Sequence, residues 1–190
     1  MLQLPPWLFA DVGSHMPFNP QKICVRQLQA AEGYIALNMP DHALRELDQI
    51  ENIGNHAFNA SMLRGEALLL KLDHHQALDA YRRAHFEKPT DLGPLLRMAW
   101  CLKRIDQLPQ AIDTMKLAYQ FHKGVPLVLY NMACYYALAG DKENALSWLA
   151  RSLRMDREYL NKIAEETDFD SLRNDPDFQH LLELTSNQNQ

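Results

Sequence analysis

The sequence predicts an all-α protein, a right-handed superhelical solenoid of helix–turn–helix repeats with capping helices at its C-terminal end. Four alanines, Ala43, Ala77, Ala111 and Ala145, follow one another at intervals of 34 residues. Twelve residues before each of them lies a small residue, and four residues after each lies a larger apolar one. A fixed period of this length is typical of arrays of paired helices. Small residues let the two helices of a pair approach closely, and stacking of successive pairs buries their remaining apolar faces.

The composition indicates a folded, soluble protein. Of the 190 residues 47% are hydrophobic and 23% are charged, and the net charge is −5 without a basic stripe along the sequence. These values argue against disorder and against a nucleic-acid-binding surface. No apolar run approaches the ~18 residues of a membrane span, and the N-terminus lacks the basic start of a signal peptide. We therefore expect a cytoplasmic protein with no nucleic-acid partner and no membrane insertion.

The repeats are expected at 24–57, 58–91, 92–125 and 126–159, within a repeat domain of 17–159. Pro40 and Pro109 are expected to open second helices, because the first helical position needs no N–H group. The second helix of the first repeat should include Ile50 and end near residues 52–55. Gly65 is expected where the two helices of the second repeat cross.

Residues 160–185 are expected to form a C-terminal cap, and residues 186–190 a frayed tail. The 34-residue register ends at Tyr159. Further on, Asp175 and Pro176 predict the start of a last helix, with the aspartate as N-cap and the proline at the first helical position. A cap with a polar outer face keeps the end of a solenoid soluble.

Residues 1–16 fall outside the repeats. The segment 1–12, MLQLPPWLFADV, contains two prolines that exclude a helix and the apolar residues Trp7, Leu8 and Phe9. Residues 13–16, Gly-Ser-His-Met, resemble the scar that an expression vector leaves after tag cleavage. A vector-derived leader or attached peptide, a chance match and a native leader that packs on the first repeat all stay open. In each case the apolar segment is a candidate ligand of the repeats in cis or in trans, because a tether raises its effective concentration.

The repeats resemble the tetratricopeptide-repeat (TPR) family over residues 24–159, because several positions recur together at one period. The segments Phe169-Asp170-Ser171-Leu172-Arg173 and Asp175-Pro176-Asp177-Phe178 are similar to the closing part of bacterial members. The sequence departs from the family at Gln27 and Ser61, which stand where the family has a large residue, and in keeping only Pro89 of its prolines after second helices. The resemblance implies a non-catalytic protein-interaction module whose first helices line a concave groove.

The resemblance also implies which residues line that groove. The candidate peptide-binding residues are Leu28, Glu32, Ile35, Met62, Glu66, Leu69, Leu96, Arg97, Trp100, Lys103, Arg104, Tyr130 and Cys134. They should suit a peptide with apolar anchors and one acidic group, because aromatic residues are common binding hot spots and methionines adapt to varied ligands. Two alternatives stay open: the apolar members are buried packing, and the charged members only face solvent. The clamp with which some relatives hold the acidic tail of heat-shock chaperones is reduced to Arg97.

The sequence holds no pattern typical of catalysis. None of its eight histidines forms a metal-binding pair at helical spacing, and neither a phosphate loop nor a nucleophile elbow is present. The three cysteines, Cys24, Cys101 and Cys134, lack zinc or redox spacing and are expected to be reduced structural thiols. We expect a protein that is not an enzyme and that needs no cofactor and no metal. The alternative function is a self-assembling or multi-protein scaffold that works through its convex face or its ends, and the oligomeric state is left open.

Overall fold

The computed structural model describes residues 20–51 and 53–187, and all regular elements in this part of the chain are helices. The α-helices are α1 (Pro20–Ala36), α2 (Pro40–Asp48), α3 (Ala57–Leu70), α4 (His74–Glu87), α5 (Leu92–Arg104), α6 (Leu108–Phe121), α7 (Pro126–Leu138), α8 (Lys142–Met155), α9 (Tyr159–Ile163) and α10 (Pro176–Asn187). Two 3-10 helices, η2 (Gly54–His56) and η3 (Thr167–Leu172), complete the described chain. The N-terminal segment 1–16, whose residues 1–12 were predicted as a candidate ligand, lies outside the described residues.

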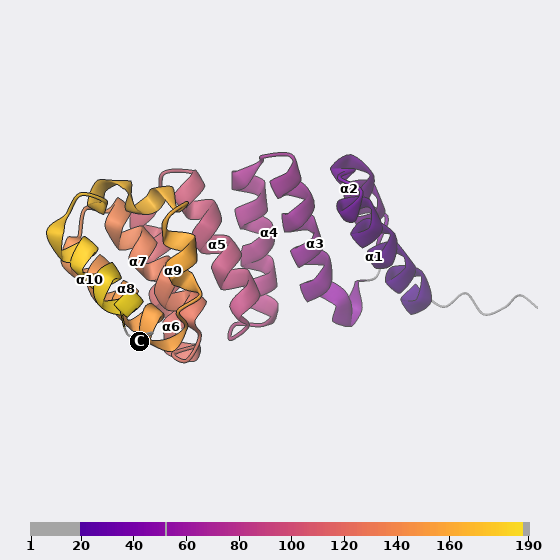
Figure 1. The fold of residues 1–190 in the computed structure, drawn as a ribbon. Helices are drawn as coiled ribbons and strands as arrows, with labels where there is room; N and C mark the ends of the chain where they lie inside the picture. Colours follow the sequence, from indigo (N-terminus) through magenta and orange to yellow (C-terminus); the bar gives the residue numbers. More distant parts are fainter. Residues whose placement is uncertain (1–19, 52, 188–190) are drawn as a thin grey trace, which may run out of the picture.

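The helices form successive pairs that stack side by side, from α1 and α2 at one end to α7 and α8 at the other (Figure 1). The four alanines of the 34-residue period are all fully buried. A Cβ atom at Gly65 would lie 2.5 Å from the ring of Tyr81, itself fully buried on α4. The absence of a side chain at Gly65 is therefore what lets α3 and α4 pack. The all-α helical-repeat solenoid predicted from the sequence is confirmed.

The turns within the pairs share one backbone conformation. Asn38, Leu72, Asp106 and Gly140 are spaced by the same 34 residues and have φ angles of 56°, 59°, 58° and 73°. This left-handed conformation is easy for glycine and tolerable for asparagine and aspartate. Leu72 lacks both advantages, so its turn carries a conformational cost that the other three largely avoid.

The second helix of the first pair is shorter than predicted. It has nine residues, whereas α4, α6 and α8 have 14 each. By the 34-residue period, the last turn of a regular second helix would include Ile50, but α2 ends at Asp48. A hollow of ≈ 610 Å³ opens beside the end of α2, with Ile50, Ile53, Ala57 and Phe86 among the residues that line it.

The first pair differs from the others in the residue that follows the early end of α2, Ile50. The equivalent positions in the other second helices are Ala84, Ala118 and Ser152, all with no exposed surface. The Ser152 hydroxyl donates a hydrogen bond of 3.0 Å to the Pro126 carbonyl at the start of α7, so the end of a second helix comes close to the start of its partner. A small side chain permits this approach. Isoleucine is larger than the side chains at the equivalent positions, and α2 ends before it.

The C-terminal segment folds back onto the last helix pair. η3 packs against α7 and α10 packs against α8. The Asp175 carboxylate accepts hydrogen bonds from the backbone N–H groups of Asp177 (2.9 Å) and Phe178 (3.2 Å), so the predicted start of the last helix is confirmed. The Lys142 ammonium lies 2.7 Å from the carboxylates of both Asp175 and Asp177 and lowers the pKa of Asp175, chiefly through its hydrogen bond.

Candidate functional site

A hollow opens between the first helices of the first two pairs. It has a volume of ≈ 320 Å³ and lies between α1 and the start of α3. Its lining residues are Val25, Leu28, Gln29, Glu32, His56, Asn59, Met62 and Leu63. Leu28 is buried, Met62 is half-buried, and Glu32 is exposed at the rim. The structure thus brings together three of the residues that the sequence assigned to the groove. Leu28 and Met62 form an apolar floor, and the Glu32 carboxylate lies at the rim.

A second exposed feature is the indole ring of Trp100 on α5. It is 38% exposed, so part of the indole is accessible to a ligand. The Arg104 guanidinium lies 5.7 Å from its ring centroid, and Arg97 is exposed one turn earlier on the same helix. The His74 ring approaches the indole edge-on, at a centroid distance of 5.3 Å. The sequence pointed to the two arginines, but His74 was missed because it comes from α4 and no periodic pattern links it to Trp100.

The side chains of four other candidate residues are partly buried. Ile35, Leu69 and Leu96 are half-buried and pack against the apolar cores of the helix pairs, and Glu66 is also half-buried. Their burial gives weight to the packing interpretation that the sequence left open. None of them lines the hollow between α1 and α3.

The prediction of an open groove at α7 is wrong for Tyr130 and Cys134. Tyr130 is 4% exposed and Cys134 is 2% exposed. The Tyr130 ring lies 4.8 Å from the Tyr159 ring of α9 and 5.8 Å from the Phe169 ring of η3, measured between centroids. The C-terminal segment therefore covers the face of α7 on which the sequence analysis placed the groove.

Lys103 is also unavailable as a ligand contact, because its ammonium is held by the same C-terminal segment. The distance from Lys103 Nζ to Asp168 Oδ2 is 2.6 Å. The side chain of Lys103 is 22% exposed and that of Asp168 is 10% exposed. Among the predicted groove residues, those that keep exposed surface or line the hollow therefore lie on α1, α3 and α5. Among the described residues, no helix is long and apolar enough to cross a membrane.

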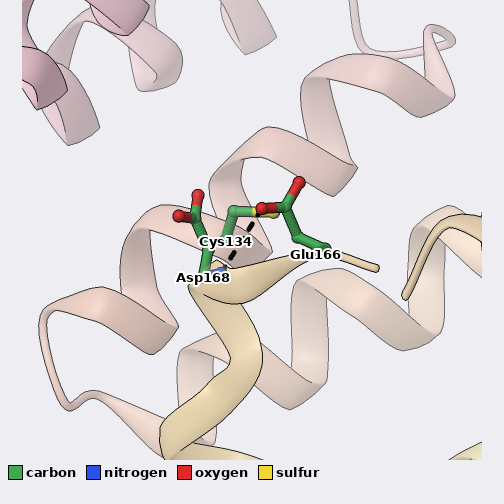
Figure 2. Close-up of side chains that lie close together, drawn as sticks. All are labelled: Cys134, Glu166 and Asp168. Carbon is green, nitrogen blue, oxygen red and sulfur yellow. Dashed lines mark hydrogen bonds between the residues drawn. The ribbon is translucent and has the colours of Figure 1, made fainter. Parts of the chain in front are cut away.

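Cys134, Glu166 and Asp168 form a cluster with the composition of a metal site (Figure 2). Their potential ligand atoms all lie within 4.8 Å of one another. A metal ion requires a deprotonated thiol and free carboxylates. Here the Asp168 carboxylate is bound by Lys103, and burial raises the pKa of the Cys134 thiol, which keeps it protonated. We interpret the cluster as a structural ion pair beside a neutral thiol, with Lys103 supplying the positive charge.

The three cysteines are expected to react with thiol reagents only after unfolding. Cys24, Cys101 and Cys134 are at most 2% exposed, and burial raises the pKa of Cys101 to about 11. The thiolate is the reactive form of cysteine. A small thiol-reactive disulfide reagent at pH 8 should therefore label none of the three rapidly in the native state. The same reagent in strong denaturant should label all three. Rapid labelling of one thiol in the native protein would contradict the burial described here.

Comparisons with known proteins identify solved structures that share the fold. No protein-family model matches the chain, and no curated protein matches it. Among solved structures, it resembles MamA with a TM-score of 0.72 at 11% identity, covering 88% of this chain and 94% of that one. YrrB, described as a TPR protein with an unusual peptide-binding site, gives a TM-score of 0.67 at 15% identity and covers 86% and 85% of the two chains. MamA 41-end from Desulfovibrio magneticus RS-1 gives a TM-score of 0.64 at 16% identity and covers 88% and 98%. At these identities the likeness establishes the fold alone, and the described chain has a TPR-like fold.

Proposed function

We propose that this protein is a non-catalytic interaction module that binds a peptide or partner segment on its concave surface between α1 and α5. The observation that carries the proposal is the apolar hollow over Leu28 and Met62 together with the exposed indole of Trp100. A hollow with an apolar floor and a nearby exposed aromatic residue is typical of surfaces that bind apolar anchors. The structural likeness to YrrB, which is described as peptide-binding, supports the same function.

The distribution of charge suggests how a ligand is oriented. Arg97 and Arg104 are exposed on either side of Trp100, whereas Lys103 is neutralised by Asp168. An acidic group of the ligand is therefore best placed beside Trp100. The apolar anchor then lies in the hollow between α1 and α3, where Glu32 is at the rim. A basic group on the ligand, close to its apolar anchor, could then form an ion pair with the Glu32 carboxylate.

The closure at α7 limits the length of the ligand that the concave surface can hold. Packed helices lie about 10 Å apart, so the path from α1 across α3 to α5 is roughly 20 Å. An extended chain advances about 3.3 Å per residue, which gives a core recognition segment of about six residues. We propose the N-terminal segment 1–12 as one such ligand, in cis or in trans, because its Trp7-Leu8-Phe9 run is apolar and Asp11 follows it.

Peptide titration tests the proposal. Synthetic MLQLPPWLFADV would be added to a chain that begins at Pro17 and keeps every described helix. We expect saturable binding, with a loss of about 2 kcal/mol or more for Trp100→Ala and for Met62→Ala, the size of a hot-spot effect. Leu184→Ala is the matched control, because this residue is 50% exposed on α10, away from the hollow. Binding that both groove variants leave unchanged would refute the concave site, and absence of binding would refute segment 1–12 as its ligand.

The alternative function is self-assembly or scaffolding through an end of the solenoid. It is favoured by the exposed Leu184 on the terminal helix α10. Light scattering separates the two functions. Self-assembly predicts a mass that rises with concentration and that Leu184→Ala lowers, whereas a peptide-binding monomer keeps its mass.

A further inference from the structure

One edge of the solenoid carries exposed apolar side chains in three successive repeats. The residues are Phe86, Phe121 and Met155, which are 81%, 48% and 47% exposed. They lie in the last turns of α4, α6 and α8, respectively. Because all second helices run in the same direction, these ends share one edge, and the turns that follow α4 and α6 lie along the lower edge in Figure 1. We call the three residues and the bases around them the basic edge.

The basic edge is positive although the chain as a whole is negative. The stretches 82–89, 116–123 and 150–157 each contain two more bases than acids, whereas the net charge of the chain is −5. The corresponding stretch of the first repeat, 48–55, has two acids and no base, so the positive charge belongs to the last three repeats. Arg83, Lys88, Lys123 and Arg154 are exposed. None of these four forms an ion pair with an acid among the described residues; the only charge-related contact of Lys88 is with the Phe58 ring, at 4.0 Å. The edge therefore presents positive charge without an ion-pair partner among the described residues, beside apolar carbon, although Arg83 shares the hollow beside α2 with Asp48 and Glu87.

The opposite edge shows that this combination is not a general property of the solenoid. That edge holds the turns within the helix pairs, at 36–42, 70–76, 104–110 and 138–144, with five acids and three bases in total. It also exposes apolar side chains, including Leu37 at 69% and Leu138 at 43%. The two edges thus resemble each other in apolar exposure and differ in charge. The helix dipole favours bases at the ends of the second helices, but it gives no reason for phenyl rings to protrude beside them.

We propose that the basic edge docks the protein onto an anionic membrane surface. Peripheral binding of this kind needs two contributions, apolar side chains that enter the interface and bases that meet anionic lipid headgroups. The three side chains stand at the ends of three successive second helices, so they are available on one edge of the solenoid. Protruding phenyl rings enter a deformable bilayer interface without a shaped pocket, whereas a protein partner gains most from anchors that fill preformed pockets. The concave surface takes no part in this contact, so the inference is independent of the proposed peptide binding.

The net negative charge of the chain makes the contact orientation-specific. An anionic vesicle repels the molecule as a whole, so binding requires the basic edge to face the lipid. Each base near an anionic leaflet strengthens binding about fivefold. Salt screens this attraction within about one Debye length, so the electrostatic part should disappear at high ionic strength.

Co-sedimentation of the full chain with lipid vesicles tests the inference. The probes are vesicles of phosphatidylcholine alone and vesicles containing about one third phosphatidylserine. We expect binding to the anionic vesicles only, and loss of that binding when the salt is raised to about 0.5 M. The triple variant Arg83→Glu, Lys123→Glu, Arg154→Glu should lower the binding constant more than a hundredfold, from about fivefold per base. Phe86→Ser with Phe121→Ser should lower it at least fivefold.

The matched control is Leu37→Ser with Leu138→Ser, which removes comparable apolar surface from the opposite edge and should leave binding unchanged. All of the substituted side chains are exposed, and unchanged thermal unfolding would confirm that each variant is folded. The inference is overturned if the full chain does not bind anionic vesicles. It is also overturned if Leu37→Ser with Leu138→Ser lowers binding as much as the edge variants do. An acidic peptide that binds the basic edge while vesicles do not would also overturn it, and would assign the edge to a protein partner.

Discussion

Replacing Gly65 with alanine is expected to lower the free energy of unfolding by about 2 kcal/mol, in spite of the higher helix propensity of alanine. The new Cβ atom would lie 2.5 Å from two ring atoms of Tyr81, closer than any real contact. Tyr81 has no exposed surface and cannot swing away, so α3 and α4 must separate. Urea unfolding followed by circular dichroism measures the loss.

Gly33→Ala is the matched control for this prediction. Gly33 lies inside α1, and a Cβ atom there would meet nothing within 4 Å. This substitution should stabilise the protein by about 0.5–1 kcal/mol, because only propensity changes. Combining Gly65→Ala with Tyr81→Leu should cost less than the two single effects together, since the smaller side chain removes the clash. Equal effects of Gly65→Ala and Gly33→Ala would show that the helices do not meet as described.

Lys103→Met is expected to destabilise the protein by about 3 kcal/mol at neutral pH. The substitution leaves the Asp168 carboxylate, whose side chain is 10% exposed, without its positive partner. A buried charge that loses its partner costs several times more than the pair contributed. Thermal and urea unfolding of the variant measure the loss. The double variant Lys103→Met with Asp168→Asn should recover part of it, because the uncompensated charge is then gone.

Lys116→Met provides the comparison at the surface. Its ion pair with Asp113 spans 3.1 Å between side chains that are 51% and 73% exposed. Water and salt screen such a pair, so the expected effect is below about 0.5 kcal/mol. If Lys103→Met were as mild as Lys116→Met, the C-terminal segment would not be fastened to α5 through Asp168, and the closure of the concave surface would lose its main polar contact.

The residues predicted for the groove follow the repeat register, and the binding role assigned to them stays a prediction. Leu28, Met62 and Trp100 were identified because they occupy outward positions of first helices, and the structure leaves them beside a hollow or exposed to solvent. Tyr130 and Cys134 occupy the same register positions but are buried. No local pattern could separate the two groups, because the segment that covers α7 has left the 34-residue period.

The sequence by itself determined the helical pairs, their order and their close crossings, since each repeat contacts mainly its neighbours and a local period encodes those contacts. It also determined the start of α10, through the N-cap Asp175 and Pro176. Only the tertiary structure decided which first helices stay open, because the Lys103–Asp168 pair joins positions 65 residues apart. It alone gathered the bases of three distant helix ends into one edge, since charges scattered along a chain become a surface only when parallel helices bring them side by side.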